Sequence, residues 1–591
     1  MCGIAAELRF DDRPADAAAL ARMSACLDRR GPDGNGLWTR DRIGLAHRRL
    51  SIIDLSIRGA QPMADPKLGL AVVFNGIVYN YRELREELAA AGYEFFSTSD
   101  TEVLLKAYHR WGVDFVQRLE GMFAFVLVET DTGRAVLARD RLGKKPLYLA
   151  ESGGVLRAAS TVRALLAAGD VDTSLDPVAL HHYLSWHSIV PPPRTVLNGV
   201  RKLPPATVMV VEQDGTRHEH RYWEATFERP AERGSADEWI ERVRDALGRA
   251  VARRMVADVP VGVLLSGGID SSLIVALLAQ QGQRGLRTFS IGFPDAGGHV
   301  GDEFEFSDLV AETYETEHRQ LRVEPDRIAA ALPDAVASMS EPMVSHDAVA
   351  FFLLSEEVRK HVKVVQSGQG ADEVFAGYHW YDEVDGTDLH AAAEVYQGAF
   401  FDRDHATVNA VLHPSLRLDR PVSLDFVEEH FARPGAATAL DRALRLDQEV
   451  MLVDDPVKRV DNMTMAHGLE ARTPFLDHEL VELAAACPPE YKVALDGKGI
   501  LKAAARGVLP DEVIDRRKGY FPVPALMHLE GPPLELVREA LTDPVARERE
   551  LFAPGLVDEL LADPNKHQTP SGASVLWQLG ALELWLHAHG V

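Results

Sequence analysis

The stretch Val261–Ser272, with the sequence VGVLLSGGIDSS, constrains the fold of this chain more than any other. Its first five residues are apolar, as in a buried parallel strand, and Ser271 and Ser272 open an apolar helix. The glycines between them let backbone N–H groups approach an anion, whose charge the helix N-terminus favours. The sequence therefore predicts a strand, turn and helix that bind phosphate. Asp270 would hold a magnesium ion that rides on that phosphate.

This string differs from the phosphate loop of kinases and GTPases, GxxxxGK[ST], and resembles the pyrophosphate loop of ATP pyrophosphatases. In that family ATP is split between its α and β phosphates, and a carboxylate becomes an acyl-adenylate. An isolated Gly-Gly pair would favour a plain strand-turn-helix, but the whole string is more specific. The resemblance implies that ATP is bound by Leu265, Ser266, Gly267, Gly268, Asp270, Ser271 and Ser272.

Composition limits the class of protein. A chain of 591 residues exceeds one hydrophobic core, so we expect two or more domains. Three cysteines suit a reducing cytoplasm, and no membrane span or signal pattern is present. The formal net charge of −26 opposes nonspecific binding to nucleic acid or to an anionic membrane. We therefore expect a cytoplasmic protein with small-molecule substrates and neither nucleic-acid nor membrane partners.

The amino terminus, Met1-Cys2-Gly3-Ile4, offers a candidate nucleophile. Initiator methionine is normally removed before a residue as small as cysteine, which leaves a thiol and a free amine on Cys2. The amine, with a reference pKa of about 7.7–8.0, is matched to accept a proton from a thiol whose reference pKa is about 8.5. A cysteine that merely follows Met1 is the alternative, so this interpretation depends on the residues downstream.

Residues 1 to about 210 alternate short strand patterns with helical ones. The expected strands are Gly3–Phe10, Ile43–Ile53, Ala71–Tyr79, Met122–Glu129 and Arg134–Ala138, and the expected helices are Ala15–Asp28, Tyr81–Ala91 and Thr101–Trp111. Within this frame stand RRGPD from residue 29, HRRLS from residue 47, FNG from residue 74 and SDTE from residue 99. With Cys2, these motifs resemble a class II glutamine amidotransferase domain, an N-terminal-nucleophile fold of two stacked antiparallel sheets between helices.

The resemblance implies a role for each of five residues. Cys2 would attack the side-chain amide of glutamine, form a γ-glutamyl thioester and release ammonia. The Asn75 amide and the Gly76 N–H would form the oxyanion hole. Arg49 would bind the α-carboxylate of glutamine and Asp100 its α-ammonium. Asn75 is therefore both a catalytic and a glutamine-binding candidate.

The proline-rich segment 191–205 marks the expected domain boundary, followed by a hairpin near Thr207–Tyr222 and a charged helix, Ala236–Met255. Beyond it, strands alternate with helices, which predicts a doubly wound parallel sheet with ligands at the carboxyl ends of its strands. The expected strands are Val261–Leu265, Thr288–Phe293, His318–Val323 and His361–Gln366, and the expected helices are Ser307–Thr313, Ile328–Ala337 and Ala348–Arg359. The last strand ends in a second glycine-rich turn, SGQGADE from residue 367.

Together the two halves resemble the glutamine-hydrolysing asparagine synthetases over nearly the whole chain. The resemblance implies that Ser367 and Gly368 bind ATP, that Ile291 lies beside the adenine, and that Asp372 joins Asp270 on magnesium. Lys498 would meet the triphosphate as pyrophosphate leaves. Four charged residues would lie in a helical segment that walls the acceptor site, with structural ion pairs as the alternative: Asp461, Glu470, Arg472 and Asp477.

Two departures from the family pattern bear on function. Ile77 replaces a glutamate near the glutamine, which puts glutamine affinity in question. Gln369 replaces a glutamate that faces the acyl-adenylate and can accept a proton from ammonia, and a neutral amide is a poor base. With the segment around Glu341 and Asp347, Gln369 resembles the subfamily that forms the terminal amide of N-acetylglutaminylglutamine. We therefore expect that dipeptide as acceptor, with Gln369, Glu341 and Asp347 at its site, and asparagine synthesis as the alternative.

The expected architecture is an α+β N-terminal-nucleophile sandwich (αββα) followed by an α/β doubly wound ATP pyrophosphatase domain and a helical C-terminal part. The expected bounds are 1–210, 225–535 and 536–591, and the apolar run Val575–Leu586 should be a helix on the core of the second domain. ATP and Mg²⁺ are the expected cofactors, and the family suggests a homodimer. A silent metabolite sensor and a β-lactam-forming relative are disfavoured, because the full set of glutaminase residues is present.

Overall fold

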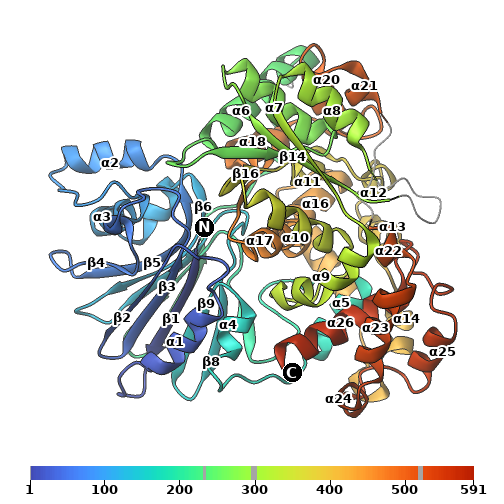
Figure 1. Cartoon of the computed structure of the whole chain (residues 1–591), viewed down its shortest axis with the longest axis horizontal. Helices are drawn as coiled ribbons and strands as arrows, with labels where there is room; N and C mark the ends of the chain where they lie inside the picture. Colours follow the sequence, from blue (N-terminus) through green and yellow to red (C-terminus); the bar gives the residue numbers. More distant parts are fainter. Residues whose placement is uncertain (1, 230–233, 295–301, 517–522) are drawn as a thin grey trace.

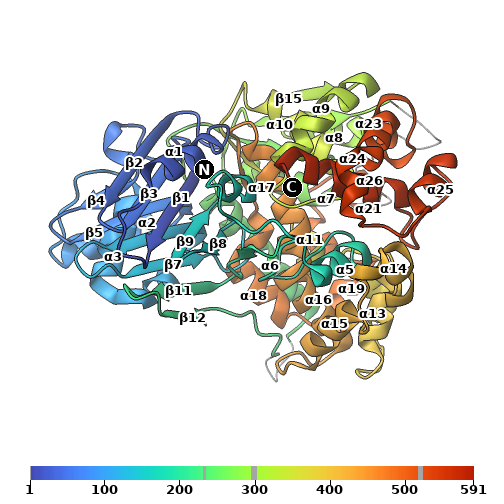
Figure 2. The same ribbon diagram turned by 90° about the horizontal axis from the view of Figure 1, so that it is seen from below.

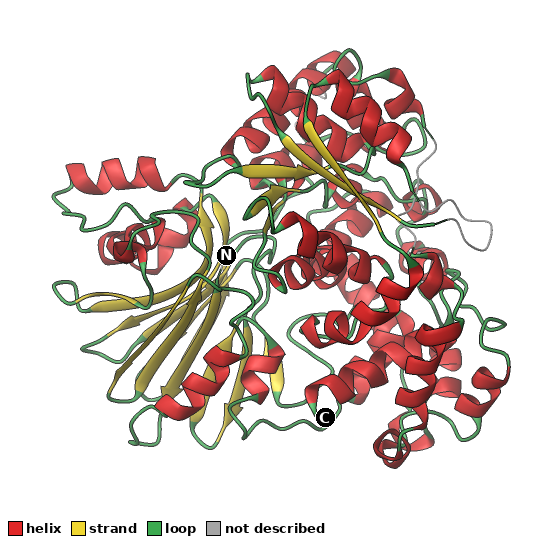
Figure 3. Ribbon diagram, viewed as in Figure 1, coloured by secondary structure: helices red, strands yellow, loops and turns green. Residues whose placement is uncertain are grey.

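The computed structural model describes residues 2–229, 234–294, 302–516 and 523–591. Two antiparallel sheets formed by the chain up to Arg221 lie beside a smaller parallel sheet surrounded by helices (Figure 1). Figure 3 shows that strands dominate the first half and helices the second. In the described ranges, no helix is long and apolar enough to cross a membrane.

The first half is a sandwich of two six-stranded antiparallel sheets, with strand orders β10-β8-β9-β1-β3-β2 and β12-β11-β7-β6-β5-β4. Because side chains alternate across each strand, one set from each sheet meets in a shared core that includes Ile4, Leu45 and Val126. The strands are β1 (Gly3–Arg9), β2 (Gly34–Arg40), β3 (Ile43–Arg49), β4 (Met63–Asp65), β5 (Leu70–Val78), β6 (Gly121–Glu129), β7 (Ala135–Arg139), β8 (Tyr148–Ser152), β9 (Val155–Ala159), β10 (Val200–Lys202), β11 (Thr207–Val211) and β12 (Arg217–Arg221).

Helices cover both outer faces of this sandwich, so the expected αββα order is confirmed. Helices α1 (Ala17–Ala25) and α4 (Val162–Leu166) pack on the sheet that contains β1. Helices α2 (Tyr81–Ala90) and α3 (Asp100–Trp111) pack on the sheet that contains β5. Ser99 caps α3 by accepting from the Thr101 N–H, which places Asp100 in the first turn.

The proline-rich segment contributes to the sandwich. Strand β10 lies within it and joins the first sheet, and the predicted hairpin, β11 and β12, completes the second. The sandwich therefore extends to Arg221, beyond residue 210. Helix α5 (Pro177–Ser185) leaves the sandwich and packs on helices of the second half, among which it lies in the view from below (Figure 2).

The second half contains a five-stranded parallel sheet with the order β15-β14-β13-β16-β17. The chain runs outward from β13 to β15 and then crosses to β16 on the other side of β13. This reversal opens a crevice at the carboxyl ends of β13 and β16, where open α/β sheets bind ligands. The strands are β13 (Val261–Leu264), β14 (Arg287–Gly292), β15 (Glu317–Arg322), β16 (Val364–Gln366) and β17 (Glu470–Arg472).

Helices surround this sheet. Helix α7 has apolar residues on all its faces, and it is accordingly buried in the core of the second half. The helices are α6 (Ala236–Arg253), α7 (Ile269–Gln280), α8 (Phe304–Thr313), α9 (Pro325–Ser338), α10 (Asp347–Val358), α11 (Ala371–Phe375), α12 (Trp380–Val384), α13 (Ala392–Phe400), α14 (His405–Val411), α15 (Val422–Ala432), α16 (Ala439–Leu446), α17 (Lys458–Met465), α18 (His478–Ala486), α19 (Pro489–Val493), α20 (Gly499–Ala505), α21 (Asp511–Asp515), α22 (Pro524–Met527), α23 (Gly531–Thr542), α24 (Pro544–Arg549), α25 (Leu556–Ala562) and α26 (Val575–His589).

The C-terminal helix α26 packs on α9 and α23, as its apolar run predicts. The indole N–H of Trp577 donates to the Val344 carbonyl at 2.7 Å, and that of Trp585 donates to the Met339 carbonyl at 2.9 Å. These bonds satisfy the polar atoms of two buried aromatic side chains. The helix thus fixes the loop that precedes α10.

Candidate active sites

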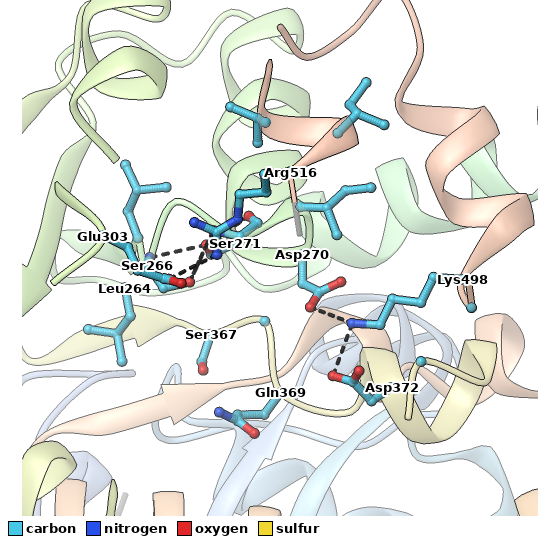
Figure 4. A pocket seen from close by; sticks show the side chains of 18 of the residues that line it. Leu264, Ser266, Asp270, Ser271, Glu303, Ser367, Gln369, Asp372, Lys498 and Arg516 are labelled. Atoms are coloured by element: carbon cyan, nitrogen blue, oxygen red, sulfur yellow. Dashed lines mark hydrogen bonds and ion pairs between the residues drawn. The ribbon is translucent and has the colours of Figure 1, made fainter. Parts of the chain in front are cut away.

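A cavity of about 1060 Å³ lies at the carboxyl ends of the parallel strands (Figure 4). Ligand pockets usually measure roughly 300–1,000 Å³, so this one has room for a nucleotide and a second substrate. Most of the predicted ATP-binding residues line it: Leu265, Ser266, Gly268, Asp270, Ser271, Ile291, Ser367 and Gly368.

Two predicted residues, Gly267 and Ser272, support the loop and do not line the cavity. Gly267 has a φ of +77°, and a Cβ there would lie 2.6 Å from the Ser307 nitrogen, so no other residue fits. Ser272 is fully buried within α7.

The first glycine-rich loop, residues 265–268 between β13 and α7, is held by serine side chains. Ser271 Oγ accepts from the Ser266 N–H at 3.2 Å, and Ser266 Oγ accepts from the Gly268 N–H at 3.3 Å. No side chain caps the start of α7. The first-turn N–H groups of α7 are thus suited to bind an anion in the cavity.

The second loop, Ser367 to Gly370, approaches the first closely. A Cβ on Gly368 would lie 2.9 Å from the Asp270 Cβ, and Gly370 has a φ of +94° with Leu476 against it. Both positions therefore require glycine. The two loops face one cavity, as a pyrophosphate held from two sides requires.

Lys498 lies between Asp270 and Asp372, with its Nζ 2.7 Å and 2.9 Å from their respective Oδ2 atoms (Figure 4). Burial opposes the lysine charge, but the two carboxylates raise the pKa of Lys498 above its usual value. Its backbone φ of +56° is rare for a residue with a side chain, a strain typical of functional sites. Two carboxylates that share one cation also fit Mg²⁺, which prefers oxygen ligands.

Two of the three acceptor-site candidates, Gln369 and Asp347, line this cavity. Asp347 begins α10, and its Oδ1 lies 3.2 Å from Arg459 Nη1. Burial raises the pKa of Asp347 even though Arg459 opposes that effect. The third candidate, Glu341, does not line the cavity. It lies in the contact between the halves, where its Oε2 is 3.1 Å from the buried Nζ of Lys202.

The four charged residues expected to wall the acceptor site also lie elsewhere. Asp461 pairs with Arg30 and Lys145, each at 2.9 Å, and Asp477 pairs with Arg254. Glu470 and Arg472 form strand β17, so the expectation that they lie in a helical segment is wrong. None of the four lines the large cavity. They form ion pairs where the halves meet, which is the alternative weighed above.

Arg516 lines the large cavity and was missed by the sequence analysis. Its Nη2 donates to Glu303 Oε2 at 2.9 Å, and its guanidinium lies over the Phe306 ring. A Cβ on Gly268 would lie 3.7 Å from Arg516 Nη2, so this cation reaches the first glycine-rich loop. The sequence signal was the basic run of residues 516–518 before Gly519.

A second cavity, of about 30 Å³, contains Cys2. The Cys2 N–H donates to Asn75 Oδ1 at 3.0 Å. Asn75 is fully buried, and within the described ranges its Nδ2 has no hydrogen-bond partner, as expected of a donor kept for an oxyanion. A Cβ on Gly76 would lie 2.1 Å from the Met122 carbonyl oxygen, so this position requires glycine. Burial raises the pKa of the Cys2 thiol, which therefore needs a base to become a thiolate.

The predicted glutamine-binding residues surround the same cavity. Arg49 donates to the carbonyls of Ser56, at 2.8 Å, and Asp54. Asp100 Oδ2 accepts from the Val78 N–H at 3.1 Å, and burial, with the charge of Glu470, raises its pKa to about 6. Ile77 also lines the cavity, so the departure from the family pattern noted at this position puts an apolar side chain beside the expected glutamine site. Cys2, Arg49 and Asp100 are thus brought together as the sequence predicts, with Glu470 as an unpredicted neighbour.

The fold and the two cavities define a glutamine-dependent amidotransferase with an ATP site. Residues 1–223 match the model of the glutamine amidotransferase domain, and residues 242–587 match that of asparagine synthase. The chain belongs to the asparagine synthase family and is an amide-forming ligase, as the sequence resemblance predicts.

Named relatives extend over most of the chain. Asparagine synthetase [glutamine-hydrolyzing] 1 of Bacillus subtilis is 32% identical, with 89% of this chain and 87% of that protein covered. Asparagine synthetase [glutamine-hydrolyzing] 3 of the same organism is 31% identical, over 88% and 87%. Amidase chry2 of Gibberella zeae is 27% identical, over 87% and 86%.

Proposed function

We propose that this enzyme hydrolyses glutamine at Cys2 and uses the ammonia to form an amide on a carboxylate that ATP has activated. The supporting observation is that one chain carries both a buried N-terminal cysteine site and a glycine-lined cavity with Lys498 between two carboxylates. A carboxylate oxygen would attack the α-phosphorus of ATP and displace pyrophosphate. Ammonia would then attack the acyl carbon and displace AMP.

In the first half-reaction, the Cys2 thiol passes its proton to the amine of the mature terminus and attacks the amide carbon of glutamine. The oxyanion that forms is stabilised by Asn75 Nδ2 and the Gly76 N–H. The ammonium of Cys2 returns its proton to the leaving nitrogen, and water then cleaves the γ-glutamyl thioester to release glutamate and the Cys2 thiol. Arg49 and Asp100 orient glutamine through its α-carboxylate and α-ammonium.

In the second half-reaction, the two glycine-rich loops bind the phosphates of ATP. Lys498 stabilises the charge that develops as pyrophosphate leaves. Asp270 and Asp372 would hold Mg²⁺, which when bound neutralises charge on the phosphates. Arg516, next to the first loop, adds a further positive charge on that side.

We propose L-aspartate as the acceptor to test first, because the two B. subtilis relatives are named asparagine synthetases. The product would be asparagine. The family match supports amide formation on an acyl-adenylate in either case.

A specific observation favours a second acceptor, N-acetylglutaminylglutamine. Gln369 lies in the large cavity where asparagine-forming relatives carry a glutamate, and a neutral amide cannot take a proton from ammonia. Asp347, a carboxylate from the segment that resembles the dipeptide-amide subfamily, lines the same cavity. The cavity volume leaves room for a dipeptide beside the nucleotide.

The deciding experiment measures pyrophosphate release with ATP, Mg²⁺ and glutamine, offering L-aspartate and the dipeptide in parallel. Release with aspartate identifies an asparagine synthetase, and release with the dipeptide alone identifies the second acceptor. In the Cys2→Ala variant, glutamine-dependent release should be abolished and ammonium-dependent release retained. Loss of both would contradict a two-site enzyme.

A further inference from the structure

One residue of the Cys2 cavity comes from the second half of the chain. The other residues that line this cavity all lie between Cys2 and Thr101, whereas Glu470 belongs to strand β17 of the parallel sheet. Its side chain is 1% exposed. The second half thus places a carboxylate beside the nucleophile of the first half.

Strand β17 holds Glu470 rigidly. Its backbone N–H donates to the Lys363 carbonyl at 2.8 Å, and it pairs with Val364 of β16. Arg472 Nε donates to Glu470 Oε1 at 2.6 Å, and Arg472 Nη1 donates to the carbonyls of Arg254 and Val256. The carboxylate therefore has a fixed position, which a group that orients another must have.

The charges that face Glu470 come from both halves. Burial opposes its ionisation, but Arg472 and Lys145 are among the cations that hold the pKa of Glu470 below its ordinary value, so it is ionised at neutral pH. In return, its charge raises the pKa of Cys2 and of Asp100. Arg49 lines the same cavity and acts on Cys2 in the opposite direction.

We propose that Glu470 is a positioning residue for glutamine hydrolysis, supplied by the synthetase half, that holds the α-ammonium of mature Cys2. Asn75 Oδ1 accepts from the Cys2 nitrogen at 3.0 Å, and Glu470 lines the same small cavity, where its carboxylate would accept from the amine in a second direction. When the thiol passes its proton to the amine, Glu470 stabilises the ammonium that forms. That ammonium then gives the proton to the amide nitrogen of the tetrahedral intermediate, which departs as ammonia, so Glu470 itself neither gains nor loses a proton.

This assignment makes the glutaminase centre dependent on the docked synthetase half. Strand β17 also touches the ATP side, because the Ser367 N–H of the second phosphate loop donates to the Arg472 carbonyl at 2.8 Å. Strand β17 thus contacts the Cys2 cavity through Glu470 and the ATP side through Arg472. The inference rests on the proposed function only in that glutamine is hydrolysed at Cys2.

The test is the Glu470→Gln variant, whose amide keeps the shape of the side chain and an oxygen for Arg472. The kcat/KM for glutamine hydrolysis should fall about tenfold or more, in the range of a lost orienting contact. The acid limb of its pH profile should move to lower pH by about half a unit or more, because removing a negative charge lowers the pKa of the amine. Ammonium-driven pyrophosphate release should stay within about twofold of wild type.

Two further variants separate positioning from structure. Glu470→Asp keeps the charge and should restore the pH limb while the rate recovers only in part. Asp33→Asn is the matched control, because it removes another ion pair between the halves, Asp33 to Lys363 at 2.7 Å, outside the Cys2 cavity. Its pH limb should not move.

The proposal is overturned if Glu470→Gln hydrolyses glutamine with the wild-type pH profile. It is also overturned if ammonium-driven release falls in parallel, because that result indicates a structural role for β17. Glutamate formation is measured without an acceptor. A wrong acceptor assignment therefore leaves the Glu470 test intact.

Discussion

Asp100 lies in the first turn of α3, 4% exposed, where burial and the charge of Glu470 raise its pKa to about 6. A carboxylate that binds the substrate ammonium must be ionised. Glutamine should therefore bind fully above pH 6 and progressively more weakly as the pH falls through that value. At that site the ammonium would also relieve the repulsion between Asp100 and Glu470.

The prediction for Asp100 concerns binding, so it is best measured in the Cys2→Ala variant, where no thiol titrates. By calorimetry, the Kd for glutamine should rise about tenfold per pH unit below pH 6. Adding Asp100→Asn should weaken binding above pH 6, where the aspartate is ionised, and flatten the profile. A Kd that stays constant from pH 5 to 8 in the Cys2→Ala variant would contradict the assignment of Asp100.

At the scale of elements, Gly377 shows how a turn can control a catalytic side chain. It follows α11, and a Cβ there would lie 2.2 Å from Lys498 Cε and 2.3 Å from Asp372 Oδ1. Gly377 does not have a positive φ, so close approach alone requires glycine at this position. The turn after α11 thus provides the space in which Lys498 meets both carboxylates.

Gly377→Ala should therefore displace Lys498 from Asp270 and Asp372 without disturbing the other half. We expect ATP-dependent pyrophosphate release to fall by about a hundredfold or more, the scale of a 1 Å misplacement. Glutamine hydrolysis should remain at the wild-type rate. Gly386→Ala is a control outside the cavity, because a Cβ there meets nothing within 4 Å. Because Gly386 has a positive φ, an alanine there strains the backbone but collides with no neighbouring atom.

The strands and helices also differ in how well the sequence could predict them. Long periodic elements such as β5 and α6 were expected close to their observed bounds. Asn75 and Gly76, which belong to one short motif, lie beside Cys2. Strand β17 has three residues, too few to display a period, and lay in a segment expected to be helical. Its Glu470 reaches Cys2 only through tertiary packing, which no spacing in the chain reveals.

At the scale of the molecule, buried ion pairs join the two halves. Lys202 of β10 reaches Asp454 at 2.7 Å and Glu341 at 3.1 Å, and all three side chains are 2% exposed. Tyr148 adds a hydrogen bond to Glu341 at 3.0 Å. Charges buried this deeply are tolerated only because each has a partner. The halves are therefore held in one arrangement by a polar contact that any separation would expose.

Lys202→Met should destabilise the chain by about 3–5 kcal/mol, because it removes the nearest cation from two buried carboxylates and leaves only Lys458, 3.8 Å from Glu341. Calorimetry at a fixed scan rate should show a lower Tm, and adding Glu341→Gln and Asp454→Asn should recover part of the loss. Arg217→Met is the matched control, because it breaks an exposed pair with Glu151, 22% and 52% exposed, worth about 0–1 kcal/mol. If Lys202→Met lowered the Tm no more than Arg217→Met does, the buried contact would not be what holds the two halves in one arrangement. Coupling of the two sites through β17 would then need another anchor.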